Sequence, residues 1–158
     1  MSQELGILTD ISKGLEEHDF MDSDINRQAK TDFKYLCTQT GYTALNNVNY
    51  ITVKAATNTG DKYIGEFLVI GYDVKNKAAE FPQNILDAKK AGTFVGVVMY
   101  QGGEVKDVLV FKAAEFLKPG MFSIFKNLKG KGMYAINIGD GQNKNLKQYS
   151  FGYVVKNL

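Results

Sequence analysis

Asp73 and Lys75 close a long apolar run, GEFLVIGYDVKN, and their types and spacing could support a reaction. A carboxylate can bind a divalent metal ion, and a nearby ammonium group can stabilise charge that develops on a phosphate. Because alternate residues of a strand share a face, Gly71, Asp73 and Lys75 should point the same way, and Gly71 leaves space for a ligand or another backbone. The spacing therefore suits metal-dependent phosphodiester cleavage. It suits a solvated ion pair at a strand end about equally well.

The remaining side chains limit which metal could bind. Cys37 is the only cysteine and His18 the only histidine, which excludes an internal disulfide and a zinc site of cysteine and histidine. A bound metal would have oxygen ligands, and these favour magnesium, manganese or calcium over zinc. Cys37 lies within an apolar helical stripe, so we expect it in the core rather than as a nucleophile paired with His18.

Length and composition predict one globular domain, residues 1–158. The chain is 44% hydrophobic and 23% charged, which is ordinary for a protein in water. No run is apolar enough for a membrane span, and the first residues lack the basic flank and apolar stretch of a signal peptide. We therefore expect a cytoplasmic protein without a membrane partner.

The small net charge of +2 hides a gradient along the chain. Residues 1–32 carry 8 acids and 3 basic residues, a balance of −5, whereas residues 105–158 carry 3 acids and 9 lysines, a balance of +6. Lysines suit diffuse attraction to phosphates better than bidentate recognition of bases. The basic third could face a nucleic acid, or it could be a solvated surface or a partner for the acidic head.

Two helices should precede the strands. Residues 2–17 have apolar side chains at helical spacing and form most of an N-terminal helical extension, residues 1–20. A second helix should begin at Ser23 or Asp24, place Phe33 and Cys37 on one stripe, and end at Gly41.

The rest of the chain shows mainly the alternation typical of strands. The predicted order after the second helix is strand 42–57, strand 62–75, helix 82–92, strand 93–101, strand 104–111, an irregular segment, strand 133–138 and strand 146–158. The strand, helix, strand succession requires a crossover between parallel strands, whereas the hairpins are antiparallel. We therefore predict an α/β or α+β fold: a mixed sheet with an antiparallel hairpin, one βαβ crossover and helices packed on it. Residues 24–112 form its core, and residues 113–158 form a lysine-rich C-terminal part with two strands.

The predicted order of elements is similar to the core of the PD-(D/E)XK restriction-endonuclease-like superfamily. That order is a helix, a hairpin whose second strand ends in Asp-x-Lys, a further helix and an apolar strand. The resemblance covers residues 24–112 and implies magnesium-dependent cleavage of nucleic acids. It makes Asp73 a metal ligand and Lys75 the catalytic lysine.

The superfamily's first acid has no counterpart of the same type, because Asn49 stands near its position and a neutral amide lacks the charge that magnesium favours. Asp61 in the hairpin turn is then the candidate for the other metal ligand. A strand of roughly 40 Å would separate it from Asp73 unless a bulge or bend intervenes. Asp24 and Asp32 of the preceding helix are alternatives.

The segment FKNLKGKGMY combines lysines with aromatic side chains and could hold a phosphate backbone. Its candidate nucleic-acid-binding residues are Lys126, Lys129 and Lys131. The sequence thus predicts a nucleic-acid-binding protein on a nuclease-like scaffold, with magnesium or manganese as cofactor if it is catalytic. The alternative is a non-catalytic binding or inhibitor module that docks on a protein or nucleic-acid partner.

Overall fold

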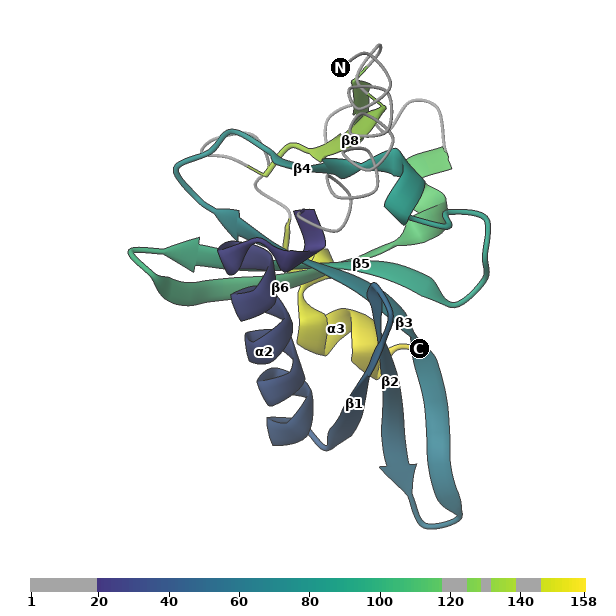
Figure 1. Ribbon diagram of the computed structural model, residues 1–158. Helices are drawn as coiled ribbons and strands as arrows, with labels where there is room; N and C mark the ends of the chain where they lie inside the picture. Colours follow the sequence, from purple (N-terminus) through teal and green to yellow (C-terminus); the bar gives the residue numbers. More distant parts are fainter. Residues whose placement is uncertain (1–19, 118–124, 129–131, 139–145) are drawn as a thin grey trace, which may run out of the picture.

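The computed structural model describes residues 20–117, 125–128, 132–138 and 146–158. The expected N-terminal helix, His18, Lys129 and Lys131 lie outside these residues. A five-stranded sheet forms the centre, in the order β1-β2-β3-β5-β6 (Figure 1). Its strands are β1 (Tyr42–Asn47), β2 (Tyr50–Thr57), β3 (Gly60–Asp73), β5 (Thr93–Gln101) and β6 (Glu104–Lys112).

The fold class predicted from the sequence is confirmed. β3 and β5 are parallel, and the other neighbouring pairs of this sheet are antiparallel. Helices α2 (Asp24–Gln39) and α3 (Phe151–Lys156) pack on one face. The other face carries a small antiparallel sheet of β4 (Ala79–Pro82), β8 (Met133–Ile136) and β7 (Phe125–Leu128). Three 3₁₀ turns complete the described elements: Gln83–Ile85, Ala113–Leu117 and Leu146–Tyr149.

The alternation of β3 divides its side chains between two apolar cores, as the sequence predicts. Phe67 and Val69 pack with the helices, whereas Leu68 and Ile70 pack against the small sheet and its turns. All four are at most 1% exposed, so the middle of β3 is buried on both faces. A strand in that position needs a nearly continuous apolar sequence.

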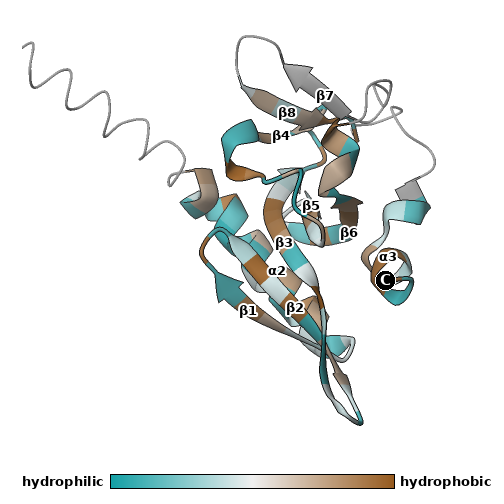
Figure 2. Ribbon diagram, turned by 90° about the vertical axis from the view of Figure 1, so that its right-hand side faces the viewer, coloured by the Kyte–Doolittle hydropathy of each residue, from teal (hydrophilic) through white to brown (hydrophobic). Residues whose placement is uncertain are grey.

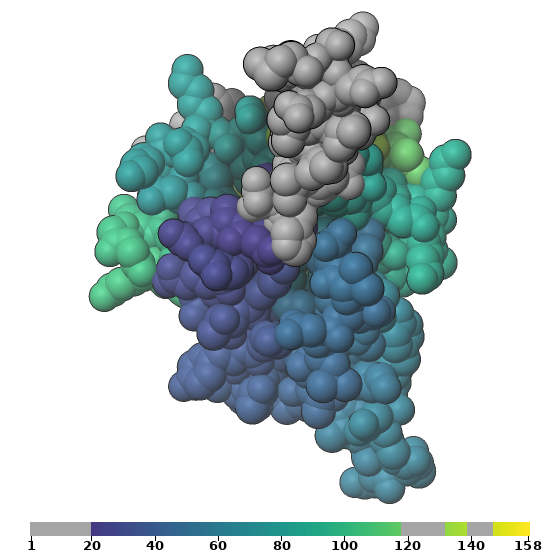
Figure 3. All heavy atoms as spheres, in the orientation of Figure 1, coloured from purple at the N-terminus to yellow at the C-terminus, as the bar shows by residue number. Residues whose placement is uncertain are grey.

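Two regions of the molecule lie at opposite ends. In both views β4 and β8 stand at one end, and the tip of the β2–β3 hairpin stands at the other (Figures 1 and 2). The space-filling view shows this tip projecting clear of the body (Figure 3).

Helix α2 buries the predicted stripe. Ala29, Phe33 and Cys37 are 0% exposed, and burial raises the pKa of the Cys37 thiol to about 12. A protonated, enclosed thiol is a packing residue. The edge of Phe151 in α3 contacts the Phe33 ring at a centroid distance of 5.5 Å, which joins the two helices over the sheet.

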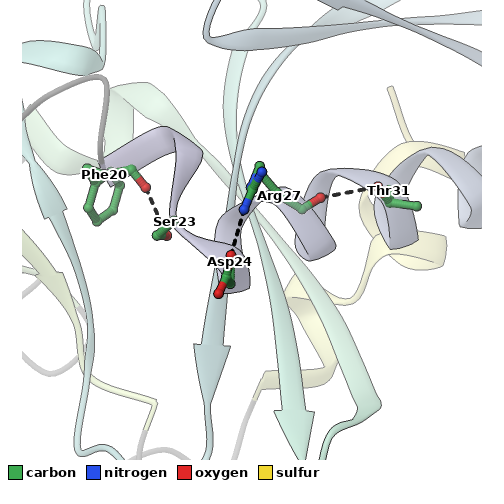
Figure 4. A network of polar contacts seen from close by, with 5 residues as sticks. All are labelled: Phe20, Ser23, Asp24, Arg27 and Thr31. Atoms are coloured by element: carbon green, nitrogen blue, oxygen red, sulfur yellow. Dashed lines mark hydrogen bonds and ion pairs between the residues drawn. The ribbon is translucent and has the colours of Figure 1, made fainter. Parts of the chain in front are cut away.

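The start of α2 is held by polar contacts along the helix itself (Figure 4). The hydroxyl of Ser23 donates to the carbonyl of Phe20 at 3.0 Å, and the guanidinium of Arg27 contacts the carboxylate of Asp24 at 2.6 Å. The hydroxyl of Thr31 donates to the carbonyl of Arg27 at 3.2 Å. Asp24 is 97% exposed and pairs with its own helix.

The strand predicted over 42–57 is wrong, because this segment forms two strands. β1 and β2 pair around a two-residue turn, with Asn47 opposite Tyr50. Val48 in that turn has a positive φ of 55°, a conformation that a β-branched residue rarely adopts. The sequence therefore lacks the usual signal of a tight hairpin.

The predicted helix over 82–92 is also wrong. Ala79 and Phe81 are buried and alternate with exposed Glu80, and this segment pairs with β8 as β4. Pro82 ends that edge strand and a single 3₁₀ turn follows it. The crossover between β3 and β5 therefore contains β4 and a 3₁₀ turn instead of an α-helix.

The strand predicted over 146–158 forms a 3₁₀ turn and helix α3. Phe151 and Val155 are buried at a spacing of one helical turn. A short apolar run fits either period, and packing beside α2 selects the helix. The two strands of the C-terminal part are instead β7 and β8; β8 was predicted, over residues 133–138.

Candidate functional site

The carboxyl end of β3 places Asp73 beside Lys75. Asp73 is the last residue of the strand, so Lys75 lies in the following turn and its position does not follow from strand alternation. The backbone N–H of Lys75 donates to Oδ1 of Asp73 at 3.1 Å, and its Nζ lies 3.8 Å from Oδ2. The Asp73 side chain is 28% exposed and that of Lys75 is 80% exposed. The two predicted groups therefore meet at the surface.

Asp73 also lines a polar cavity of about 440 Å³. Asn76 and Lys77 contribute to its wall from the turn after β3, and Glu80 contributes from β4. Ile25 contributes from the first turn of α2. Two acidic residues, an asparagine and a lysine thus line the cavity, and these are the residue types that bind a hard cation or a phosphate.

Sequence reasoning missed Glu80. Its signal was the alternation of Ala79, Glu80 and Phe81, which places the carboxylate on the opposite side from two buried neighbours. The prediction of a helix beginning at Pro82 drew attention away from that pattern. Glu80 comes to the same cavity as Asp73 because β4 folds back beside the end of β3.

Gly71 fixes how closely α2 approaches this site. A Cβ atom on Gly71 would lie 2.6 Å from both Cγ1 and the carbonyl oxygen of Ile25. The backbone N–H of Gly71 donates to Oδ1 of Asn26 at 2.7 Å, beyond the end of β2 where no ladder partner exists. The space left by Gly71 is therefore filled by the backbone of α2, one of the two possibilities expected from the sequence.

Of the other candidate acids, Asp61 is remote from Asp73, and Asp32 is bonded to a tyrosine of β5. Asp61 lies at the opposite end of β3, a strand of 14 residues, and stands opposite Ala56 in the exposed hairpin. A distance of roughly 40 Å along the strand separates it from Asp73. Asp32 accepts a hydrogen bond from the hydroxyl of Tyr100 at 2.6 Å, which ties α2 to the end of β5.

A second carboxylate on β3, Glu66, was not singled out from the sequence. It is 8% exposed and accepts hydrogen bonds from Nδ2 of Asn47 at 2.9 Å and from the hydroxyls of Thr52 at 2.6 Å and Tyr63 at 2.8 Å. Burial alone would raise the pKa of Glu66, but these hydrogen bonds and the charge of Lys90 outweigh it, so the pKa lies below its ordinary value. Burial, together with the hydrogen bond to Glu66 and its charge, raises the pKa of Tyr63 to about 12. This cluster joins β1, β2 and β3.

The predicted nucleic-acid-binding lysines are only partly placed. The backbone of Lys126 lies in β7, opposite Ala135 of β8. Lys129 and Lys131 lie outside the described residues.

Among the residues that the structure describes, His, Cys, Asp and Glu form no group of three or more that could hold a metal ion, and no helix is long and apolar enough to cross a membrane. Comparisons with protein-family models, curated proteins and solved structures found no match to this chain.

Proposed function

We propose that this chain binds nucleic acid and, with magnesium or manganese, hydrolyses phosphodiester bonds at the cavity beside Asp73. The observation that carries the proposal is that Asp73 and Glu80, from different strands, line one polar cavity while Lys75 lies 3.8 Å from Asp73. Two carboxylates with an ammonium group nearby are the groups that metal-assisted phosphodiester cleavage uses.

The order of elements supports a scaffold similar to that of the PD-(D/E)XK superfamily. A helix, α2, precedes three antiparallel strands, and β5 then lies parallel to the third. In this proposal Glu80 replaces Asp61 as the second metal ligand, because Glu80 lines the cavity and Asp61 does not. A fold-level likeness does not establish an activity, so the proposal depends on the side chains.

The residues of the cavity have distinct roles in the proposed reaction. The carboxylates of Asp73 and Glu80 and the amide of Asn76 offer oxygen atoms, the donor type that magnesium and manganese bind. A bound ion would supply positive charge at the phosphate. The ammonium group of Lys75, exposed to solvent, would stabilise negative charge on the phosphate oxygens. Lys126, Lys129 and Lys131 would contact the nucleic-acid backbone, in a protein that we place in the cytoplasm.

The test is incubation of the full chain with labelled single- and double-stranded DNA and RNA, in magnesium or manganese. We expect cleavage that falls at least about a hundredfold in Asp73→Ala and in Glu80→Ala, as losing a group that stabilises the transition state does. Asp61→Ala is the matched control, because it removes an acid from the same strand at the end remote from the cavity. Cleavage that survives Asp73→Ala would refute the assignment.

The non-catalytic binding module is favoured by one observation, the separation of Asp61 from Asp73 along β3. In that case the cavity would hold a phosphate or a cation without a reaction. Binding to nucleic acid that weakens as salt rises, with no cleavage in either metal, would support this alternative. Absence of both binding and cleavage would overturn the nuclease and any nucleic-acid-binding module, and would leave a module that docks on a protein.

A further inference from the structure

Among the residues that the structure describes, strand β1 is an edge of the five-stranded sheet, and one row of its backbone groups has no strand partner. In the described part of the chain, β1 pairs with β2 only. Asn47 and Tyr50 flank a two-residue turn, so they form a hydrogen-bonded pair. Because bonded and non-bonded pairs alternate along an antiparallel ladder, Leu45 and Thr43 also bond to β2 through their backbone groups. The N–H and C=O groups of the intervening residues must then point away from β2. These are Tyr42, Ala44 and Asn46.

The two edges of this sheet differ in how they are protected. β6, the other edge, carries charged residues on its solvent side and is bridged at Leu109 by Ser150. Charges and covering segments are what keep an edge strand from pairing with another chain. β1 has the sequence YTALNN, without a charged residue or a proline. Its Leu45 is 60% exposed.

We propose that two copies of this chain associate through β1, antiparallel about a two-fold axis at Ala44. Tyr42 of each copy then lies opposite Asn46 of the other, and all three residues with free backbone groups find partners. About six hydrogen bonds form across the axis, two for each bonded pair. The two five-stranded sheets become one continuous sheet.

The occupant is a second copy because this edge is complementary to itself. An isologous interface places the same residues on both sides, so any charge on β1 would meet a like charge close to the axis. The uncharged strand avoids that repulsion. Leu45 would lie opposite Thr43 of the second copy, which covers an apolar side chain that the single chain exposes.

The interface is small, so the association should be weak. Six-residue edges bury less than the roughly 1,000 Å² that a stable interface needs. The dimer should therefore appear only as concentration rises.

Sedimentation velocity of the full chain over about a hundredfold range of concentration tests the proposal. We expect the mass to rise from monomer to dimer for the wild type and for Val105→Lys, the control on the β6 edge. Leu45→Lys should weaken dimerisation severalfold, because it removes the apolar contact with Thr43 of the second copy and brings two ammonium groups to diagonal positions across the axis. Asn46→Pro should do so by removing an edge N–H that has no strand partner among the described residues. Circular-dichroism melts establish that each variant is folded.

Disulfide trapping tests the register. Thr43→Cys and Leu45→Cys, mixed and oxidised, should form a crosslinked heterodimer several-fold faster than either variant alone, because a non-bonded antiparallel pair brings the two Cα atoms within about 4.5 Å. Cys37 is buried and does not compete. A wild type that stays monomeric would overturn the proposal. The β1 edge would then be open to an extended segment of another protein. A dimer that persists in both Leu45→Lys and Asn46→Pro, or crosslinking that is no faster in the mixture, would also overturn the proposal.

Discussion

Glu66 and Asp73 are two carboxylates on one strand, β3, and they are held in opposite ways. Glu66 is nearly enclosed and accepts hydrogen bonds from side chains of three different positions in the sheet. Asp73 stands at the rim of a cavity, where its carboxylate accepts a hydrogen bond from the backbone N–H of Lys75 and lies near the ammonium group of the same residue. A buried charge requires such partners, whereas a carboxylate in an open cavity keeps oxygen lone pairs for a ligand. Glu66 therefore stabilises the sheet, and Asp73 can serve a reaction at little cost in stability.

The largest effect on stability should come from Gly71→Ala, beside the Asp73 cavity. The new Cβ would lie 2.6 Å from the backbone of Ile25, so α2 must move away from β3. We expect a loss of about 3 kcal/mol in the free energy of unfolding, measured by urea denaturation. Gly152→Ala is the matched control, because its Cβ meets nothing within 4 Å, and it should leave stability unchanged or raise it. Equal stability of the two variants would contradict the close approach of α2.

Glu66→Ala should destabilise the protein by about 2 kcal/mol, because it removes a nearly buried acceptor that holds the half-buried Thr52 hydroxyl and the Asn47 amide. Urea denaturation measures the change. Glu66→Gln, which keeps an acceptor oxygen, should lose less. If Glu66→Ala were as stable as the wild type, the contrast with Asp73 would fail.

The pH dependence of stability is a further test of the structural role of Glu66. The folded pKa of Glu66 lies below its ordinary value of 4.5, so the unfolded chain binds more protons between the two values and stability rises with pH there. The contribution is complete above the unfolded pKa and is lost as pH falls through the folded pKa. The stability difference between wild type and Glu66→Gln should shrink on acidification from pH ~6 to pH ~3. A difference that is constant over this range would contradict the depressed pKa.

The smallest change in stability should follow Asp73→Ala. Its contact with Lys75 is solvent-exposed, and such pairs contribute little, so the free energy of unfolding should stay within about 0.5 kcal/mol of the wild type. In the proposed reaction the same variant should lower cleavage at least about a hundredfold. A thermal melt run beside the cleavage assay separates the two effects, and a large loss of stability would make Asp73 a structural residue like Glu66.

The elements predicted from the sequence are those whose apolar pattern extends over many residues. The stripe of Phe33 and Cys37 in α2 and the two faces of β3 follow from residue spacing alone, because burial on one stripe or on alternate faces is decided locally. The hairpin turn at Val48 could not be predicted, since tertiary pairing imposes a φ that valine disfavours.

Only some residues of the candidate site were singled out from the sequence. Asp73 and Lys75 were found because they are neighbours in sequence. Glu80 was missed, since its position depends on pairing between β4 and β8, which are far apart along the chain. The Glu66 cluster likewise needs the registers of three strands before its hydrogen bonds can be foreseen.

The parallel ladder between β3 and β5 has a consequence for the kinetics of folding. The ladders β1–β2, β2–β3 and β5–β6 join strands that are adjacent in sequence, so each can form as a local hairpin. Within the five-stranded sheet, the β3–β5 ladder is the one that must first close a long connection, over 74–92, and this closure costs chain entropy before any contact forms. We expect two separately collapsing halves, residues 42–73 and 93–112, whose encounter along β3 and β5 limits the folding rate.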